Sequence, residues 1–336
     1  PGHSRRLWSR LLESQPAMRS WSEGSPHNVA RPGQGKLGVI TTGIARRYYR
    51  EVLPDLPAAP PHLHLAAYPL PVDLLRSFAS GLERLLVIEE GYPFVERLLR
   101  GLLPGPVEIL GRESGAIPAA GELSPTAVRA ALGLPALPHQ ETPQGVALPG
   151  RPPQLCEGCA HRDAYSALQQ ALAELGEHVV TGDIGCYTLG ALPPYGGIDT
   201  CVCMGASVGM AKGASDAGLR PAIAVIGDST FLHSGVTPLM DAAAHDTDMT
   251  LLILDNRTVA MTGGQPTALH DSHIAPLVKG LGVDPEHVHE VLAHPREVPK
   301  LAELMRREIA HPGLSVIVLQ RECIVTARSK KKGKQS

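Results

Sequence analysis

The stretch PAIAVIGDSTFLHSG at residues 221–235 decides the fold, together with MTLLILDN at residues 249–256. Each begins with a nearly continuous apolar run and ends in polar residues. Such runs are typical of strands that are covered on both faces in a parallel sheet. Asp228 and Asn256 follow the two runs directly. Because parallel strands bring their carboxyl ends to one edge of a sheet, we expect these two side chains to lie close together.

Residues 154–327 carry further segments of the same kind. HVVTGDIG (178–185) and LSVIVLQREC (314–323) read as strands, whereas HRDAYSALQQALAELG (161–176) and REVPKLAELMRREIA (296–310) have helical periodicity. Alternating strands and helices with short connections indicate a parallel sheet covered by helices. We therefore predict an α/β domain over residues 154–327.

The first half of the chain shows the same alternation over residues 36–135. LGVITTG (37–43) and RLLVIEE (84–90) read as strands, and a helical segment follows each of them. The first strand leads into TTGIA rather than into a glycine-rich phosphate loop, so we expect this domain to serve packing and assembly. The chain is thus predicted to be α/β, with two doubly wound domains built on mostly parallel sheets.

The remaining segments are expected to connect and flank these domains. Residues 1–35 read as a polar connector, and residues 136–153 as a linker rich in proline and glycine. Residues 328–336 read as a basic tail, a solvated and disordered end.

Composition excludes several classes of partner. The chain of 336 residues has a formal net charge of −2 and only 4% aromatic residues, which gives no electrostatic or stacking basis for binding nucleic acid. No apolar run of about 18 residues is present, so we expect no membrane span. The chain opens without a signal peptide, which favours the cytoplasm.

The polar ends of the two central strands have the chemistry of a metal site. Carboxylate and carboxamide oxygens suit Mg²⁺, which takes its remaining ligands from phosphate and water. Gly227 allows a close approach of the backbone, and a helix starting near Gly235 could direct free N–H groups at an anion. Taken singly, Gly-Asp-Ser and Asp-Asn are common turns. On successive strands they predict that Asp228 and Asn256 hold magnesium and a diphosphate.

All six cysteines lie in the second half of the chain. Cys156 and Cys159 form a C-x-x-C pair at the opening of the second domain, Cys186 follows a strand, and Cys323 ends the last strand. These four thiolates could gather at one edge and hold a 4Fe–4S cluster. Zinc bound with His161, a transient disulfide and inert packing remain the alternatives.

Several motifs resemble one family. The pattern GDS followed by LDN resembles the signature of thiamine-diphosphate enzymes. CEGCAHR (156–162), TGDIGCYTLGALPP (181–194), DTCVCMGASVGMAKG (199–213) and VIEEGYPFVE (87–96) are similar to the large subunit of indolepyruvate ferredoxin oxidoreductases. The resemblance implies a transketolase C-terminal-like domain followed by a thiamine-diphosphate-binding domain. The chain departs from the family in having no pyrimidine-binding domain and no terminal ferredoxin domain, so we expect it to be inactive alone.

The resemblance also assigns roles to individual residues. It places Mg²⁺ on Asp228, Asn256 and the backbone carbonyl of Thr258. Leu189 falls where the family has the apolar residue that props the cofactor into a bent form, and an ordinary core leucine is the alternative. His233 is a candidate for substrate contact or proton transfer, or alternatively caps a helix. The four cysteines are arranged like the cluster ligands of pyruvate:ferredoxin oxidoreductase. The residues expected to contact the cofactor are Gly185, Cys186, Leu189, Gly227, Asp228, Ser229, Asn256 and Thr258.

The activity implied by the resemblance is oxidative decarboxylation of an arylpyruvate such as indolepyruvate. Coenzyme A would accept the acyl group and ferredoxin the electrons, in a hetero-oligomer with a small β subunit. Three alternatives remain: another thiamine-diphosphate 2-oxoacid oxidoreductase or decarboxylase, a non-catalytic cofactor-binding assembly subunit, and a Mg²⁺-dependent phosphoryl-transfer protein. The absence of a P-loop sequence disfavours the last.

Overall fold

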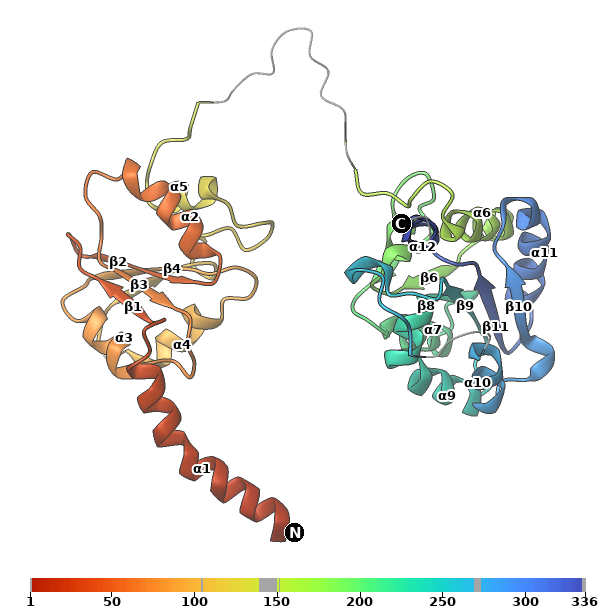
Figure 1. The fold of residues 1–336 in the computed structure, drawn as a ribbon, viewed down its shortest axis with the longest axis horizontal. Helices are drawn as coiled ribbons and strands as arrows, with labels where there is room; N and C mark the ends of the chain where they lie inside the picture. The colour runs from red at the N-terminus through yellow and green to blue at the C-terminus, as the bar shows by residue number, and fades with distance from the viewer. Residues whose placement is uncertain (1, 104, 139–149, 151, 269–272, 334–336) are drawn as a thin grey trace. The chain divides into compact units, whose positions relative to one another are not determined.

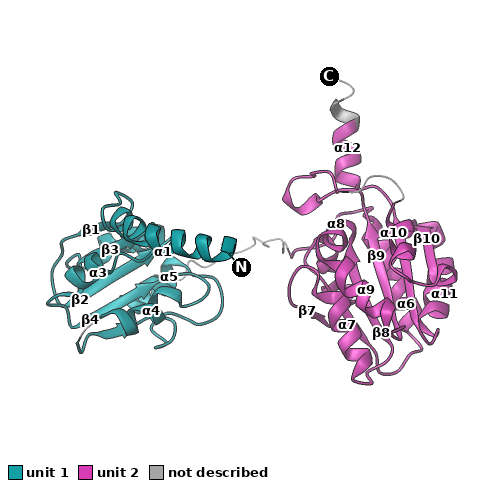
Figure 2. Ribbon diagram, turned by 90° about the horizontal axis from the view of Figure 1, so that it is seen from below, with its two compact units in different colours: residues 1–146 teal, residues 147–336 magenta. Residues whose placement is uncertain are grey.

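The computed structural model describes residues 2–103, 105–138, 150, 152–268 and 273–333. The chain divides into two compact units, residues 1–146 and residues 147–336 (Figures 1 and 2). Both units are α/β, as the sequence predicts, and each is built on one sheet. In the part of the chain that the structure describes, no helix is both long and apolar enough to cross a bilayer.

The sheet of unit 1 has five strands in the order β1-β3-β2-β4-β5. Strand β1 pairs antiparallel with β3, and the other pairs are parallel. The strands are β1 (Val29–Arg31), β2 (Leu37–Thr42), β3 (His62–Leu65), β4 (Arg84–Ile88) and β5 (Glu108–Leu110). The helices are α1 (Gly2–Glu23), α2 (Ala45–Val52), α3 (Val72–Ala79), α4 (Phe94–Leu102) and α5 (Pro125–Ala131), with a 3₁₀ turn at Leu53–Asp55.

Helices cover both faces of this sheet. Alternate residues of a strand point to opposite faces, so Leu85 and Val87 of β4 pack with α3 and α4, whereas Leu86 and Ile88 pack with α2 and α5. The doubly wound arrangement of unit 1 follows from this alternation.

The sheet of unit 1 starts earlier than the sequence predicts. A connector was expected over residues 1–35, but α1 and β1 lie there. Asn28 is buried and holds the entry to β1: its Oδ1 accepts the backbone N–H groups of Ala66 and Ala67 at 2.9 Å. A strand of three residues is too short to show apolar periodicity, and β1 is held by its pairing with β3 and by the side chain of Asn28 just before it, so the sequence pattern did not reveal it.

The sheet of unit 2 has six parallel strands in the order β10-β11-β9-β8-β6-β7. The strands are β6 (Val179–Gly182), β7 (Thr200–Cys201), β8 (Ala222–Gly227), β9 (Met249–Asp255), β10 (Val288–Leu292) and β11 (Leu314–Gln320). The helices are α6 (Ala160–Leu172), α7 (Ala206–Asp216), α8 (Asp228–Thr230), α9 (Val236–Ala244), α10 (Ile274–Gly280), α11 (Val298–Ile309) and α12 (Ile324–Gly333). A π-helical turn covers Phe231–Gly235, and 3₁₀ turns cover Cys186–Ala191, Ala260–Thr262, Pro285–His287 and Pro295–Glu297.

Unit 2 is also covered on both faces. Ile223 and Val225 of β8 pack with α6 and α11, while Ala224 and Ile226 pack with α7, α9 and α10. All six residues of β8 and all seven of β9 are buried. The continuous apolar runs of the sequence therefore have the expected cause, which is burial on both sides of the strand.

Two boundary predictions differ from the structure, and a third falls largely outside the described residues. The helix expected to start near Gly235 already begins at Asp228, directly after β8, because α8, the π turn and α9 follow one another without a break. The tail predicted to be disordered over 328–336 is partly helical, since α12 runs to Gly333. Of the linker predicted over 136–153, residues 139–149 and 151 lie outside the described residues.

Candidate functional site

The register of the sheet brings the predicted magnesium ligands to one edge. Gly227 at the end of β8 pairs with Leu254 of β9, so Asp228, which follows β8, lies beside Asp255, the last residue of β9. Asn256 follows immediately. This edge is the carboxyl end of the parallel strands, where open α/β sheets bind ligands.

A cavity of about 130 Å³ lies at this edge. It is lined by the loop after β6, the start of α8, and the turn after β9. Seven of the residues predicted to contact the cofactor line it: Gly185, Cys186, Gly227, Asp228, Ser229, Asn256 and Thr258.

Asp228 is a buried carboxylate whose two oxygens have different surroundings. Its side chain is buried, and Oδ1 accepts the Ser229 N–H at 2.8 Å. Oδ2 is buried without a hydrogen-bond partner. Burial, and then the neighbouring Asp255 carboxylate, raise the pKa of Asp228 to about 7. Buried polar atoms normally have partners, and a divalent cation would satisfy this oxygen.

The turn after β9 orients Asn256 toward the same place. Its Oδ1 accepts the backbone N–H of Thr258 at 3.1 Å. Arg257 between them has φ of 60°, and the Asp255 Oδ1 accepts its N–H at 3.0 Å. Thr258 is buried and its hydroxyl donates to the Gln265 carbonyl at 3.0 Å. The turn is therefore fixed by hydrogen bonds on both sides of Asn256.

Tyr187 explains why two glycines face the cavity. A Cβ on either Gly185 or Gly227 would lie less than 3.0 Å from the Tyr187 ring. The ring is buried, and its hydroxyl donates to the Ile184 carbonyl at 3.1 Å. Glycine is thus required at both positions by the close approach of the backbone to this ring.

Asp183 is a residue whose role the sequence did not reveal. It follows β6, is fully buried, and accepts both the backbone N–H of Ser207, at 3.1 Å, and the Ser207 hydroxyl. Its carboxylate therefore caps the amino end of α7. Burial raises the pKa of Asp183, and the hydrogen bonds from Ser207 oppose that rise. In the sequence, Asp183 lies near the end of a predicted strand and Ser207 lies 24 residues later near the start of a predicted helix, and this spacing is too weak a signal to pair the two residues.

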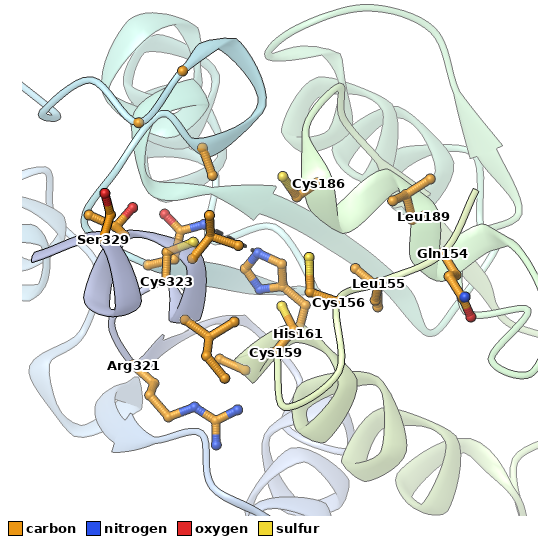
Figure 3. A pocket seen from close by; sticks show the side chains of 18 residues that line it. Gln154, Leu155, Cys156, Cys159, His161, Cys186, Leu189, Arg321, Cys323 and Ser329 are labelled. Atoms are coloured by element: carbon orange, nitrogen blue, oxygen red, sulfur yellow. Dashed lines mark hydrogen bonds between the residues drawn. The ribbon is translucent and has the colours of Figure 1, made fainter. Parts of the chain in front are cut away.

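The four predicted cluster ligands line a second cavity, of about 390 Å³ (Figure 3). Cys156 and Cys159 precede α6, Cys186 begins the 3₁₀ turn after β6, and Cys323 follows β11. Burial, with further contributions from the other three thiols, raises the pKa of Cys159 to about 11. The fold thus brings together cysteines that are far apart in the sequence.

The two cavities adjoin one another. Cys186, Asn256 and Ala260 line both, and the Cys323 N–H donates to the Asn256 carbonyl at 3.1 Å. Over the described ranges of the chain, no group of three or more histidine, cysteine, aspartate or glutamate side chains is arranged to hold a metal ion. The four thiols share a pocket without forming a preassembled metal site.

His161 lies between the two sites. It is almost fully buried, and its Nε2 is 3.4 Å from the Asn256 Nδ2. Figure 3 shows the ring surrounded by Cys156, Cys159, Cys186 and Cys323. Burial, and then the Arg321 guanidinium, lower the pKa of His161 to about 4.

Two predicted residues lie apart from the small cavity. Leu189 lines the cysteine cavity and packs against the core cluster that includes α6. His233 lies in the π-helical turn, outside the residues that line either cavity. Their roles as cofactor prop and substrate contact stay predictions.

Comparisons with known proteins agree with this geometry. Residues 183–319 match the family model "Thiamine pyrophosphate enzyme, C-terminal TPP binding domain". The indolepyruvate oxidoreductase subunit IorA of Archaeoglobus fulgidus is 35% identical over 97% of this chain. This chain is thus similar to that IorA subunit over nearly all of its own length.

Two further comparisons cover less of the chain. The β subunit of a 2-oxoacid:ferredoxin oxidoreductase from a Sulfolobus species is 28% identical over 50% of this chain and 61% of its own length. The structure of 2-oxoglutarate:ferredoxin oxidoreductase from Magnetococcus marinus is 20% identical, covers 52% of this chain and 65% of that chain, and has a TM-score of 0.44. The chain spans 55% of the length of the Archaeoglobus relative.

Proposed function

We propose that unit 2 binds Mg²⁺–thiamine diphosphate in the small cavity and acts as part of a thiamine-diphosphate-dependent 2-oxoacid:ferredoxin oxidoreductase. The observation that carries this proposal is the unpartnered Oδ2 of Asp228, buried beside Asn256 at the carboxyl edge of a parallel sheet. Asp228 and Asn256 would supply a carboxylate oxygen and a carboxamide oxygen to Mg²⁺, which would take further ligands from phosphate and water. The Thr258 carbonyl is the proposed third protein ligand.

Other residues of the small cavity position the proposed ligands and line the site for the diphosphate. The Ser229 N–H holds the Asp228 carboxylate in place, and the turn at Arg257 directs Asn256 toward the same cavity. Gly185 and Gly227 line the cavity proposed for the diphosphate, and a side chain at either position would collide with the Tyr187 ring. When bound, the thiazolium of the cofactor supplies the carbanion chemistry that decarboxylates a 2-oxo acid.

The proposed overall reaction is oxidative. The bond between the carboxylate and the keto carbon of the 2-oxo acid breaks and releases CO₂, and a thioester bond to coenzyme A forms with loss of the thiol proton. Two electrons leave one at a time and reduce two molecules of ferredoxin. We propose an indolepyruvate-like substrate and a small β subunit as partner in a hetero-oligomer, on the strength of the similarity to IorA subunits.

We further propose that Cys156, Cys159, Cys186 and Cys323 hold a 4Fe–4S cluster. Their shared cavity supports this, because it adjoins the proposed cofactor site at Cys186 and Asn256. A cluster at this position would lie next to the electron donor. Cysteine thiolates are the usual ligands of such clusters.

Calorimetric titration of the full chain with thiamine diphosphate tests the cofactor proposal. We expect binding in Mg²⁺ and none in EDTA, and we expect Asp228→Ala to abolish it. Asp241→Asn is the matched control, because it removes an exposed carboxylate of α9 that lines neither cavity. Binding that is independent of Mg²⁺, or that survives in Asp228→Ala, would contradict the assignment.

Anaerobic reconstitution with iron and sulfide tests the cluster. The wild type and Cys203→Ser should take up iron and show a charge-transfer absorption band, since Cys203 lies outside the cysteine cavity. Cys323→Ser should lose most of that band. Equal iron content in the wild type and Cys323→Ser would exclude this ligand set.

A further inference from the structure

The carboxamide of Asn256 has to present one particular end to a cation. Its oxygen can bind Mg²⁺, whereas its NH₂ group can only donate hydrogen bonds. A terminal amide rotates by half a turn with little change in shape, so the orientation has to be set by its neighbours. Two neighbours set it here, the backbone N–H of Thr258 and the ring of His161.

The first contact identifies the two ends of the amide. The Thr258 N–H can only donate, so the atom 3.1 Å away from it is the Asn256 oxygen. The nitrogen then faces the His161 Nε2 at 3.4 Å and donates to it. The imidazole Nε2 must therefore be the unprotonated nitrogen, which accepts. The oxygen keeps its second lone pair for the cavity.

The position of His161 is itself fixed. It belongs to the first turn of α6, its side chain is nearly inaccessible, and the Tyr187 ring lies edge-on to it at 6.2 Å between centroids. Its backbone N–H donates to the Cys159 thiol. The same residue thus touches the cysteine cavity through its backbone and the proposed metal ligand through its ring.

We infer that His161 is a positioning residue that holds the Asn256 carboxamide with its oxygen toward the Mg²⁺ of the cofactor. This inference rests on the proposed function. Groups that orient metal ligands from behind typically change metal affinity by about 10–100-fold when they are removed. His161 would act in this way through one accepted hydrogen bond, without touching the metal.

The test is Mn²⁺ binding to the full chain at saturating thiamine diphosphate, with free Mn²⁺ measured by its electron paramagnetic resonance signal. The protein is used without iron reconstitution, so that the cysteine cavity does not contribute. His161→Leu removes the acceptor and should weaken Mn²⁺ binding by about 10-fold or more. His161→Gln offers an oxygen that accepts the same hydrogen bond, and should bind Mn²⁺ much as the wild type does.

Leu168→Ala is the control that distinguishes loss of the hydrogen bond to Asn256 from general destabilisation of α6. Leu168 is buried on the same helix and lines neither cavity, so its truncation should lower the melting temperature and leave Mn²⁺ affinity unchanged. Equal affinity in His161→Leu and wild type would overturn the inference while leaving the cofactor proposal intact. Equally weak binding in His161→Leu and His161→Gln would also overturn it. A wild type that binds no Mn²⁺ with the cofactor would overturn both proposals.

Discussion

Replacing Asp228 with asparagine should raise the stability of the ligand-free protein and remove its response to Mg²⁺ and thiamine diphosphate. In the ligand-free protein the Oδ2 of Asp228 is buried without a donor, and the Asp255 carboxylate lies beside it. Asparagine keeps an oxygen to accept the Ser229 N–H and turns the unpartnered oxygen into a donor that can face Asp255. The variant therefore replaces a repulsion with a hydrogen bond.

The size of the effect follows from the cost of a buried unsatisfied polar group, about 1–3 kcal/mol. For a domain of the size of unit 2, each kcal/mol moves the melting temperature by about 2–4 °C. We expect Asp228→Asn to melt at least about 2 °C above the wild type in EDTA at a pH well above 7, where the Asp228 carboxyl group, whose pKa is about 7, is ionised. At ligand concentrations about 1,000 times Kd, the wild type gains about 4.1 kcal/mol, which exceeds the upper estimate of about 3 kcal/mol, and the variant gains nothing, so the order reverses.

Scanning calorimetry of both proteins, with and without Mg²⁺ and cofactor, measures this reversal. Asp241→Asn serves as the control and should follow the wild type in both conditions, because its carboxylate is exposed. A ligand-free Asp228→Asn that melts below the wild type would show that Oδ2 has a partner in solution. An undiminished shift on adding Mg²⁺ and cofactor would show that Asp228 is no ligand.

Two further predictions concern packing and acid stability. Gly227→Ala should lower the free energy of unfolding, measured in urea, by about 1–3 kcal/mol, because the added Cβ collides with the Tyr187 ring. Gly209→Ala on α7 is the control: its Cβ meets open space, so the change should be stabilising. Equal effects of the two substitutions would refute the collision. Burial alone would raise the pKa of Glu308, but hydrogen bonds from His287, Arg307 and Ser315 lower it to about 2 from an ordinary 4.5. The unfolded state then binds the proton first, so this carboxylate stabilises the fold fully above pH 4.5 and loses its stabilising contribution as the pH falls toward 2. Glu308→Gln should lower stability at pH 7 and flatten the loss in acid, and urea unfolding between pH 2 and 7 that is parallel in both proteins would contradict this.

The sequence alone was sufficient to predict the two central strands of unit 2 that end at Asp228 and Asn256. Strands buried on both faces have to be apolar throughout, so AIAVI and LLIL are recognisable without a structure. Parallel pairing then brings their polar ends to one edge, and both residues do line one cavity. The two edge strands could not be predicted in this way. Strand β7 has only two residues and β10 is only partly buried, so neither shows a continuous apolar run.

Tertiary structure alone decided the contacts between residues that are distant in the chain. Asn256 and His161 are 95 positions apart, and their hydrogen bond depends on α6 starting beside the end of β9. The sequence also does not show that Asp228 Oδ2 lacks a hydrogen-bond partner, because this depends on where the folded chain places the nearby donors. Apolar periodicity reports which residues are buried, and it carries no information on how a buried polar atom is satisfied.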